Sequence, residues 1–147
     1  MNKRKSRLIQ ILIALAVVLI LRVLVVILME YRFYFPPDFD KAFFLAGRRP
    51  TFAGWYAIGF YTHIISGPFA VVLVVTLLLT GTSRRFKQLH RWSGRLLTLI
   101  TILAVCPGGI IMATRSQAGP IAGWGFGVLA VCTLGAVGLT SVLAMKK

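Results

Sequence analysis

Four long apolar runs dominate the chain, and charged or turn-forming residues separate them. The runs cover about residues 8–29, 55–80, 92–114 and 121–145. Each has roughly 20 residues or more, which is enough for a helix to cross a hydrocarbon core about 30 Å thick. No further apolar segment is left to form a water-soluble core. We therefore expect residues 1–147 to form one all-α domain, an integral membrane four-helix bundle.

The composition favours a membrane protein over a basic soluble domain. The chain has 17 Lys and Arg against 3 Asp and Glu, a formal net charge of +14. In a soluble protein this charge would indicate nucleic acid or another anionic partner. The mean hydropathy of +0.84 is instead typical of a membrane protein. We therefore expect no nucleic-acid partner.

The charges are divided unequally between the two ends of the predicted bundle. With four spans, both termini and the segment between the second and third spans share one face. That face carries eleven basic residues: Lys3, Arg4, Lys5, Arg7, Arg84, Arg85, Lys87, Arg91, Arg95, Lys146 and Lys147. The opposite face carries all three acids and five basic residues, which are Arg32, Lys41, Arg48, Arg49 and Arg115. The positive-inside rule predicts cytoplasmic termini in the plasma (inner) membrane, with anionic lipid headgroups as partners of the basic segment.

The first outer loop, residues 30–54, contains signals for a short helix. Pro36 and Pro37 stop the preceding helix, Asp38 can cap a new one, and Gly47 can end it. Three phenylalanines lie in between, so we expect a short helix lying flat in the outer interface.

Small residues predict which helix faces pack together. In lipid they let backbones approach closely. The second span carries such a face, the third and fourth carry others, and the first span is bulky throughout. The three faces are Gly59, His63, Ser66, Gly67 and Ala70; Gly94, Thr98, Thr101, Val105 and Gly108; and Gly123, Gly127, Ala130, Leu134, Gly138 and Ser141. We expect the first span at the periphery or against a partner.

Three polar side chains in the outer halves of the spans predict a pocket. Arg22, His63 and Cys106 fall at similar depths, and polar or ionisable groups are costly in hydrocarbon. Pro68 and Pro107 each free a backbone carbonyl four residues earlier, at positions 64 and 103. We therefore predict a small polar cavity open to the outside or to the outer leaflet. Two structural alternatives stay open: Arg22 snorkels to the headgroups, and His63 only hydrogen-bonds a freed carbonyl.

The candidate cofactors are few. His63 and His90 should lie about 20 Å apart along the membrane normal, so one haem cannot bridge them within a chain. The two histidines and two cysteines are also too dispersed to predict a metal site. Cys106 and Cys132 fall at different depths, and we expect no disulfide between them. No motif predicts a catalytic residue or a bound nucleotide.

The stretches "YTHIISGPFA" and "LHRWSGRLLTL" resemble domain-of-unknown-function family 2306, a family of predicted membrane proteins. The matching positions are His63, Gly67 and Ala70, followed by His90, Arg91, Trp92, Gly94 and Arg95. Ser93 replaces the family's usual Leu, and Pro68 is additional. Family members typically continue with further helices, which implies that this chain is a short or truncated member. The resemblance implies no activity.

Two functions remain in view. The first is a non-enzymatic scaffold or accessory subunit, completed by a partner membrane subunit or a homo-oligomer, with no cofactor. The second is a redox or ligand-binding membrane protein that holds haem, quinone or anionic lipid near Arg22, His63 and Cys106. In that case Arg22 would hold the anion. His90 and Arg95 are expected to tie two cytoplasmic helix ends together.

Overall fold

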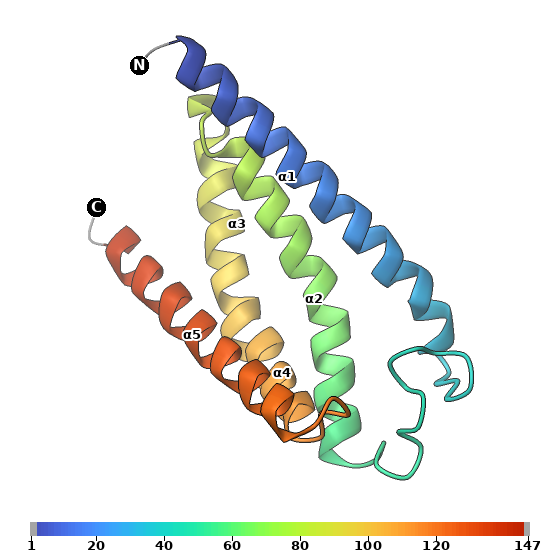
Figure 1. The fold of residues 1–147 in the computed structure, drawn as a ribbon. Coiled ribbons are helices and arrows are strands. Elements are labelled where there is room, and N and C mark those ends of the chain that lie inside the picture. Colours follow the sequence, from blue (N-terminus) through green and yellow to red (C-terminus); the bar gives the residue numbers. More distant parts are fainter. Residues whose placement is uncertain (1–2, 146–147) are drawn as a thin grey trace.

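The computed structural model describes residues 3–145, which form helices joined by turns (Figure 1). The helices are α1 (Lys3–Glu30), α2 (Trp55–Thr80), α3 (Lys87–Ile100), α4 (Cys106–Ala113) and α5 (Pro120–Met145). Three short segments complete the structure: the 3₁₀ helices η1 (Tyr31–Phe33) and η2 (Arg84–Phe86), and the π-helical η3 (Thr101–Val105). Because η3 joins α3 directly to α4, these three elements form one rod.

Four helical segments among the described residues are long and apolar enough to cross a membrane. They are Arg7–Phe33, Trp55–Thr80, Arg84–Ala113 and Pro120–Ala144. The four predicted spans are therefore confirmed, although the third helical segment begins earlier than expected. Large apolar side chains stay exposed along α1 and α5, which is the arrangement that lipid tails require of an outer surface.

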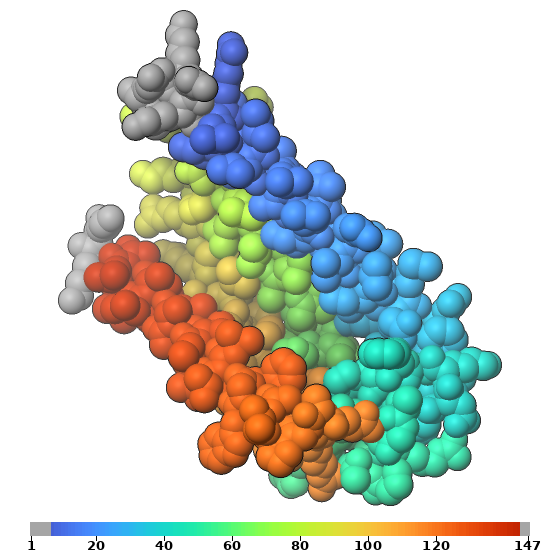
Figure 2. Space-filling view, in the orientation of Figure 1, coloured from blue at the N-terminus to red at the C-terminus, as the bar shows by residue number. Residues whose placement is uncertain are grey.

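Helix α2 is the centre of the bundle. It packs against α1, α3 and α4, whereas α5 packs mainly on α4. Helices α1 and α5 lie at opposite edges, with α2 and α3 between them (Figures 1 and 2). This confirms the peripheral position predicted for the first span. We call the end with residues 31–54 the loop end, and the opposite end, with η2, the terminal end. Lys146 and Lys147, used in the orientation argument, lie outside the described residues.

Glycines allow α2, α4 and α5 to approach closely at the loop end. A Cβ atom on Gly108 would lie 2.7 Å from the carbonyl oxygen of Gly59, and one on Gly59 would lie 2.4 Å from Ile111. A Cβ atom on Gly123 would lie 2.7 Å from the carbonyl oxygen of Ala113. Real Cβ atoms do not approach other atoms this closely, so these crossings exclude any larger residue.

The predicted small-residue face of α5 is only partly in contact. Gly127 and Gly138 have no heavy atom within 4 Å of the place where a Cβ would lie. Nearer the terminal end, the hydroxyls of Thr98 and Ser141 hydrogen-bond at 3.0 Å. The predicted face turns toward the bundle, since Gly127, Ala130, Leu134 and Gly138 are half-buried. It is in direct contact at Gly123 and Ser141, whereas open space lies beside Gly127 and Gly138.

Residues 34–54 form consecutive turns, so the predicted interfacial helix is wrong. Asp38 does cap a turn: its carboxylate accepts hydrogen bonds from the backbone N–H groups of Asp40 and Lys41, at 3.0 and 3.1 Å. The bond from the Asp40 N–H is the main cause that holds the pKa of Asp38 below its ordinary value, and the bond from the Lys41 N–H lowers it further. One helical turn follows, and Gly47, which has φ +70°, redirects the chain into further turns that lead to α2.

An aromatic cluster explains why the loop folds inward. Phe60 of α2 is 1% exposed, and the loop residues Tyr34, Ala42 and Leu45 are buried against it. The rings of Phe44 and Phe52 lie 5.4 and 5.1 Å from that of Phe60. A flat helix would leave these rings in lipid, whereas the turns bury them and gain ring–ring contacts.

Pro68 in α2 and Pro107 in the third span both lie beside changes in backbone hydrogen bonding. The carbonyl of Ile64, freed by Pro68, accepts a hydrogen bond from the Tyr31 hydroxyl, which fastens the end of α1 to α2. Pro107 follows the π-helical η3, where the N–H of Cys106 donates to the carbonyl of Thr101. Such a π bulge re-aims the carbonyls beside it.

Candidate functional site

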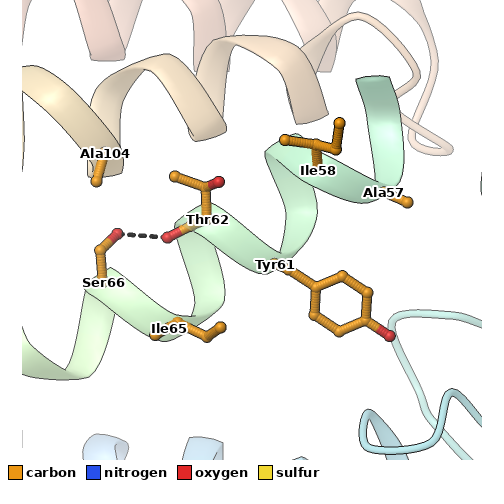
Figure 3. Close-up of a pocket in the computed structure, with 7 residues that line it drawn as sticks. All are labelled: Ala57, Ile58, Tyr61, Thr62, Ile65, Ser66 and Ala104. Atoms are coloured by element: carbon orange, nitrogen blue, oxygen red, sulfur yellow. Dashed lines mark hydrogen bonds between the residues drawn. The ribbon is translucent and has the colours of Figure 1, made fainter. Parts of the chain in front are cut away.

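One hollow on the described part of the bundle is a shallow groove on α2 beside the third span. Its lining residues are Ala57, Ile58, Tyr61, Thr62, Ile65, Ser66 and Ala104 (Figure 3). Two of the side-chain hydroxyls of this groove already have partners. The Ser66 hydroxyl donates to the carbonyl of Thr62 at 2.6 Å, and the Tyr61 hydroxyl donates to the carbonyl of Tyr34 at 3.0 Å. The groove therefore offers mainly apolar surface, with the Thr62 hydroxyl as a further polar group.

A second hollow is a cavity of about 370 Å³ at the loop end, between α2, α4, α5 and the loop. We call it the loop-end cavity. Its lining combines a cation, an imidazole and a thiol with apolar side chains. The lining residues are Phe44, Arg48, His63, Val105, Cys106, Gly109, Met112, Ala113, Ser116, Phe126, Leu129, Ala130 and Thr133. Small-molecule sites in proteins have this mixture of an apolar wall and a few polar groups.

Arg48 is the most unusual residue in the lining because it is charged and only 6% exposed. Its Nε donates to the carbonyl of Phe44 at 2.8 Å. Its Nη1 donates to the carbonyl of Arg115 at 2.9 Å and to the hydroxyl of Tyr56. The guanidinium also lies 4.2 Å from the ring centroid of Phe44. Carbonyl dipoles and aromatic rings therefore hold this side chain in place.

No carboxylate neutralises Arg48 within the described part of the chain. The two ion pairs found there join Lys41 to Asp38 and Arg49 to Asp40. A guanidinium carries five N–H donors, and the bonds above use three. The Nη2 group of Arg48 has no hydrogen-bond partner among residues 3–145. A buried cation without an acid partner carries a desolvation cost that an anionic ligand would offset.

His63 is fixed by the π bulge opposite. Its Nδ1 lies 2.8 Å from the carbonyl oxygen of Val105. Because a carbonyl only accepts, Nδ1 carries the proton in this contact. A Cβ atom on Gly109 would lie 3.3 Å from the imidazole, so this glycine makes room for the ring. The predicted alternative, a hydrogen bond from His63 to a carbonyl freed by proline, is therefore met only in kind: the acceptor is Val105, not Ile64 or Leu103.

The structure brings together two of the three residues predicted for the pocket. His63 and Cys106 both line the loop-end cavity, and Cys106 is 3% exposed. Arg22 does not line it, so the predicted clustering of all three is wrong. Its side chain is exposed on α1, and α2 stands between α1 and the cavity. Arg48 supplies the cation instead.

The motif residues of the third span lie at the terminal end, far from the cavity. Nδ1 of His90 hydrogen-bonds the hydroxyl of Thr80 at 3.1 Å, which ties α3 to the end of α2. The predicted tie between the two helices is confirmed for His90, whereas Arg95 is exposed and stacks on Trp92 at 5.5 Å. Thr80 lies 17 residues after His63, or about 25 Å along α2 at about 1.5 Å per residue. One haem cannot span that distance.

Other motif positions have structural environments. Gly94 faces Leu77, whose Cδ2 would lie 3.8 Å from a Cβ on the glycine, and Gly67 has no neighbour within 4 Å of such an atom. Ala70 is half-buried and Arg91 is exposed. Both cysteines are free thiols, with Cys106 buried and Cys132 exposed. Among the described residues, no group of three or more His, Cys, Asp or Glu side chains is placed to hold a metal ion.

Comparisons with protein-family models, curated proteins and solved structures found no match. The resemblance to domain-of-unknown-function family 2306 therefore stays a prediction that depends on the quoted motifs.

Sequence reasoning missed Arg48, which it counted only as one of five outer charges. A local signal was available: Arg48 follows Gly47 and lies four residues after Phe44. A glycine that turns the chain beside an aromatic residue can direct the next side chain inward. Its neighbour Arg49 has the same chemistry but is exposed, so only the tertiary contacts distinguish the two.

Proposed function

We propose that this chain is a non-enzymatic multi-pass membrane protein that binds a lipid-soluble ligand in the loop-end cavity. One observation supports this proposal above the others. Arg48, a buried cation without a carboxylate partner, lines the same cavity as His63 and Cys106. A structural arginine in a packed core would be satisfied on all sides, whereas this one adjoins empty space.

The orientation we propose has the terminal end in the cytoplasm and the loop-end cavity at the outer leaflet. Nine basic residues of the described chain belong to the terminal end and five to the loop end, and the sequence adds Lys146 and Lys147 after α5. Cytoplasmic loops carry the excess of Lys and Arg in membrane proteins. In this orientation the ligand would enter from the outer leaflet or from outside the cell membrane.

An absorption spectrum and native mass spectrometry of the purified protein test the ligand-binding proposal. Haem or quinone would show its own absorption, and a colourless ligand would appear as added mass. We expect a bound species whose occupancy falls in Ala130→Phe, which fills the cavity, and not in Leu139→Phe, on an exposed part of α5. An apo mass throughout, in protein taken from native membranes, would contradict the proposal.

A second candidate function, the scaffold or accessory subunit, is favoured by the open face of α5. A Cβ atom added at Gly127, Gly135 or Gly138 of α5 would have no heavy atom within 4 Å. Glycines in lipid commonly mark helix–helix contacts, either with a second copy or with another membrane subunit. Cross-linking in native membranes should give a product that Gly138→Leu removes and Leu139→Ile keeps. If neither the unchanged protein nor Leu139→Ile gives a cross-linked product, this role is excluded.

A further inference from the structure

We infer that the ligand of the loop-end cavity is an amphiphile with one apolar tail and an anionic head group, held by Arg48. This inference rests on the proposed function, that the cavity binds a ligand. Arg48 takes the place of Arg22 as the anion-binding residue. The head group would lie at Arg48 and the tail along α5.

The charge around the cavity mouth is positive. Arg48 is held in place by bonds from Nε and Nη1, which leave both N–H groups of Nη2 without a partner in the described chain. Arg115 adds a second cation: its guanidinium lies 5.6 Å from the ring centroid of Tyr56, and that of Arg48 lies 5.7 Å from the same ring. The cavity lining itself contains no acid. A carboxylate or phosphate is the complementary head group, because it accepts strong, charge-assisted bonds from a guanidinium.

The rest of the cavity suits a tail. Phe126, Leu129, Ala130 and Thr133 line one wall along α5, a stretch of eight residues that extends about 10 Å. Met112 and Ala113 lie on the α4 side. The volume of about 370 Å³ is at the lower end of the range of about 300–1,000 Å³ for small-molecule sites. One tail fits this space better than the two tails of a phospholipid.

His63 is expected to lie beside the tail rather than the head group. It comes seven residues after Tyr56, the partner of Arg48, which is about 10 Å further along α2. Its Nδ1 is committed to the carbonyl of Val105. His63→Ala should therefore weaken binding less than Arg48→Gln does, a ranking that separates this ligand from a haem held by His63.

Photolabelling in nanodiscs of neutral phosphatidylcholine tests the inference. The probes are a diazirine-bearing palmitate and the matching diazirine-bearing hexadecanol, which has a similar tail and no charge. Mass spectrometry measures labelling of residues 126–133. We expect at least tenfold more labelling by the acid than by the alcohol, which corresponds to about 1.4 kcal/mol. Arg48→Gln should abolish this preference, and Arg49→Gln, at the exposed neighbour paired with Asp40, should keep it.

Arg48 also holds the loop, so Arg48→Gln is accompanied by a second variant. Ala130→Phe fills the tail region and leaves every hydrogen bond of Arg48 in place, and it should lower acid labelling by a similar factor. Competition distinguishes the sources of the anion. Hexadecyl phosphate should displace the acid probe, whereas inorganic phosphate at the same concentration should not.

The failures are distinct. Equal labelling by acid and alcohol would overturn the anionic head group and leave the proposed function intact. Displacement by inorganic phosphate would overturn the amphiphile. Labelling of residues 126–133 no stronger than that of the exposed face of α1, by either probe, would overturn the inference together with the proposed function.

Discussion

Replacing Gly108 with Ala tests whether α2 and α4 cross as closely as the structure shows. The added Cβ would lie 2.7 Å from the carbonyl oxygen of Gly59 and 2.9 Å from the backbone nitrogen and Cβ of His63. Two of these neighbours are backbone atoms, which cannot turn away as a flexible side chain can. The helices must therefore separate, and the imidazole of His63 must move relative to Val105.

The magnitude follows from two opposing effects. Gly→Ala inside a helix stabilises by about 0.8–1.0 kcal/mol when nothing is in contact. Overpacking a close contact costs about 1–3 kcal/mol. Because Gly108 meets backbone, we take the upper part of that range and expect a net loss of about 1–2 kcal/mol. Gly138→Ala is the matched control. Its Cβ would have no neighbour within 4 Å, so the variant should be neutral or more stable.

The assay is the free energy of unfolding in mixed micelles, measured by titration with SDS and far-ultraviolet circular dichroism. The two variants change the same residue type in the same way, so helix propensity cancels when they are compared. If Gly108→Ala is as stable as Gly138→Ala, the close crossing of α2 and α4 is refuted, and the cavity built on it must have a different shape.

Three further predictions concern other parts of the chain. His90→Ala should lower the free energy of unfolding by about 0.5–1.5 kcal/mol, measured by the same SDS titration, because it removes the hydrogen bond to Thr80. Reversing Arg84 and Arg85 to Glu should produce a fraction of molecules with inverted topology, detected by a membrane-impermeant thiol reagent and a cysteine placed in the loop; unchanged labelling would count against the proposed orientation. Since backbone N–H groups lower the pKa of Asp38, its contribution is present above pH 3.8, its ordinary value, and is lost as pH falls through the lower folded-state pKa. Hydrogen exchange of residues 34–54 should accelerate there, and Asp38→Asn should remove that part of the pH dependence.

The membrane class, the four spans and the peripheral first helix could be predicted from the sequence. These properties depend on the length and hydropathy of continuous segments, and each segment carries its own signal. The proline positions were also informative, because the effect of a proline on its own helix does not depend on tertiary packing. Pro68 has no N–H to donate to the carbonyl of Ile64, and the hydroxyl of Tyr31 donates to this carbonyl instead. Placing His63 and Cys106 in one cavity followed from counting their depths along two helices.

Only the tertiary structure decided which cation lines the cavity together with His63 and Cys106. Depth along a span does not specify the direction in which a residue faces, and Arg22 is exposed on α1, which packs mainly on α2. Arg48 faces inward because the loop folds onto Phe60 through aromatic contacts between residues distant in sequence. The same contacts replaced the predicted interfacial helix with turns. Local signals at Asp38 and Gly47 were correct, but the burial of Tyr34 and the packing of further loop rings on Phe60 outweighed the continuation of a helix.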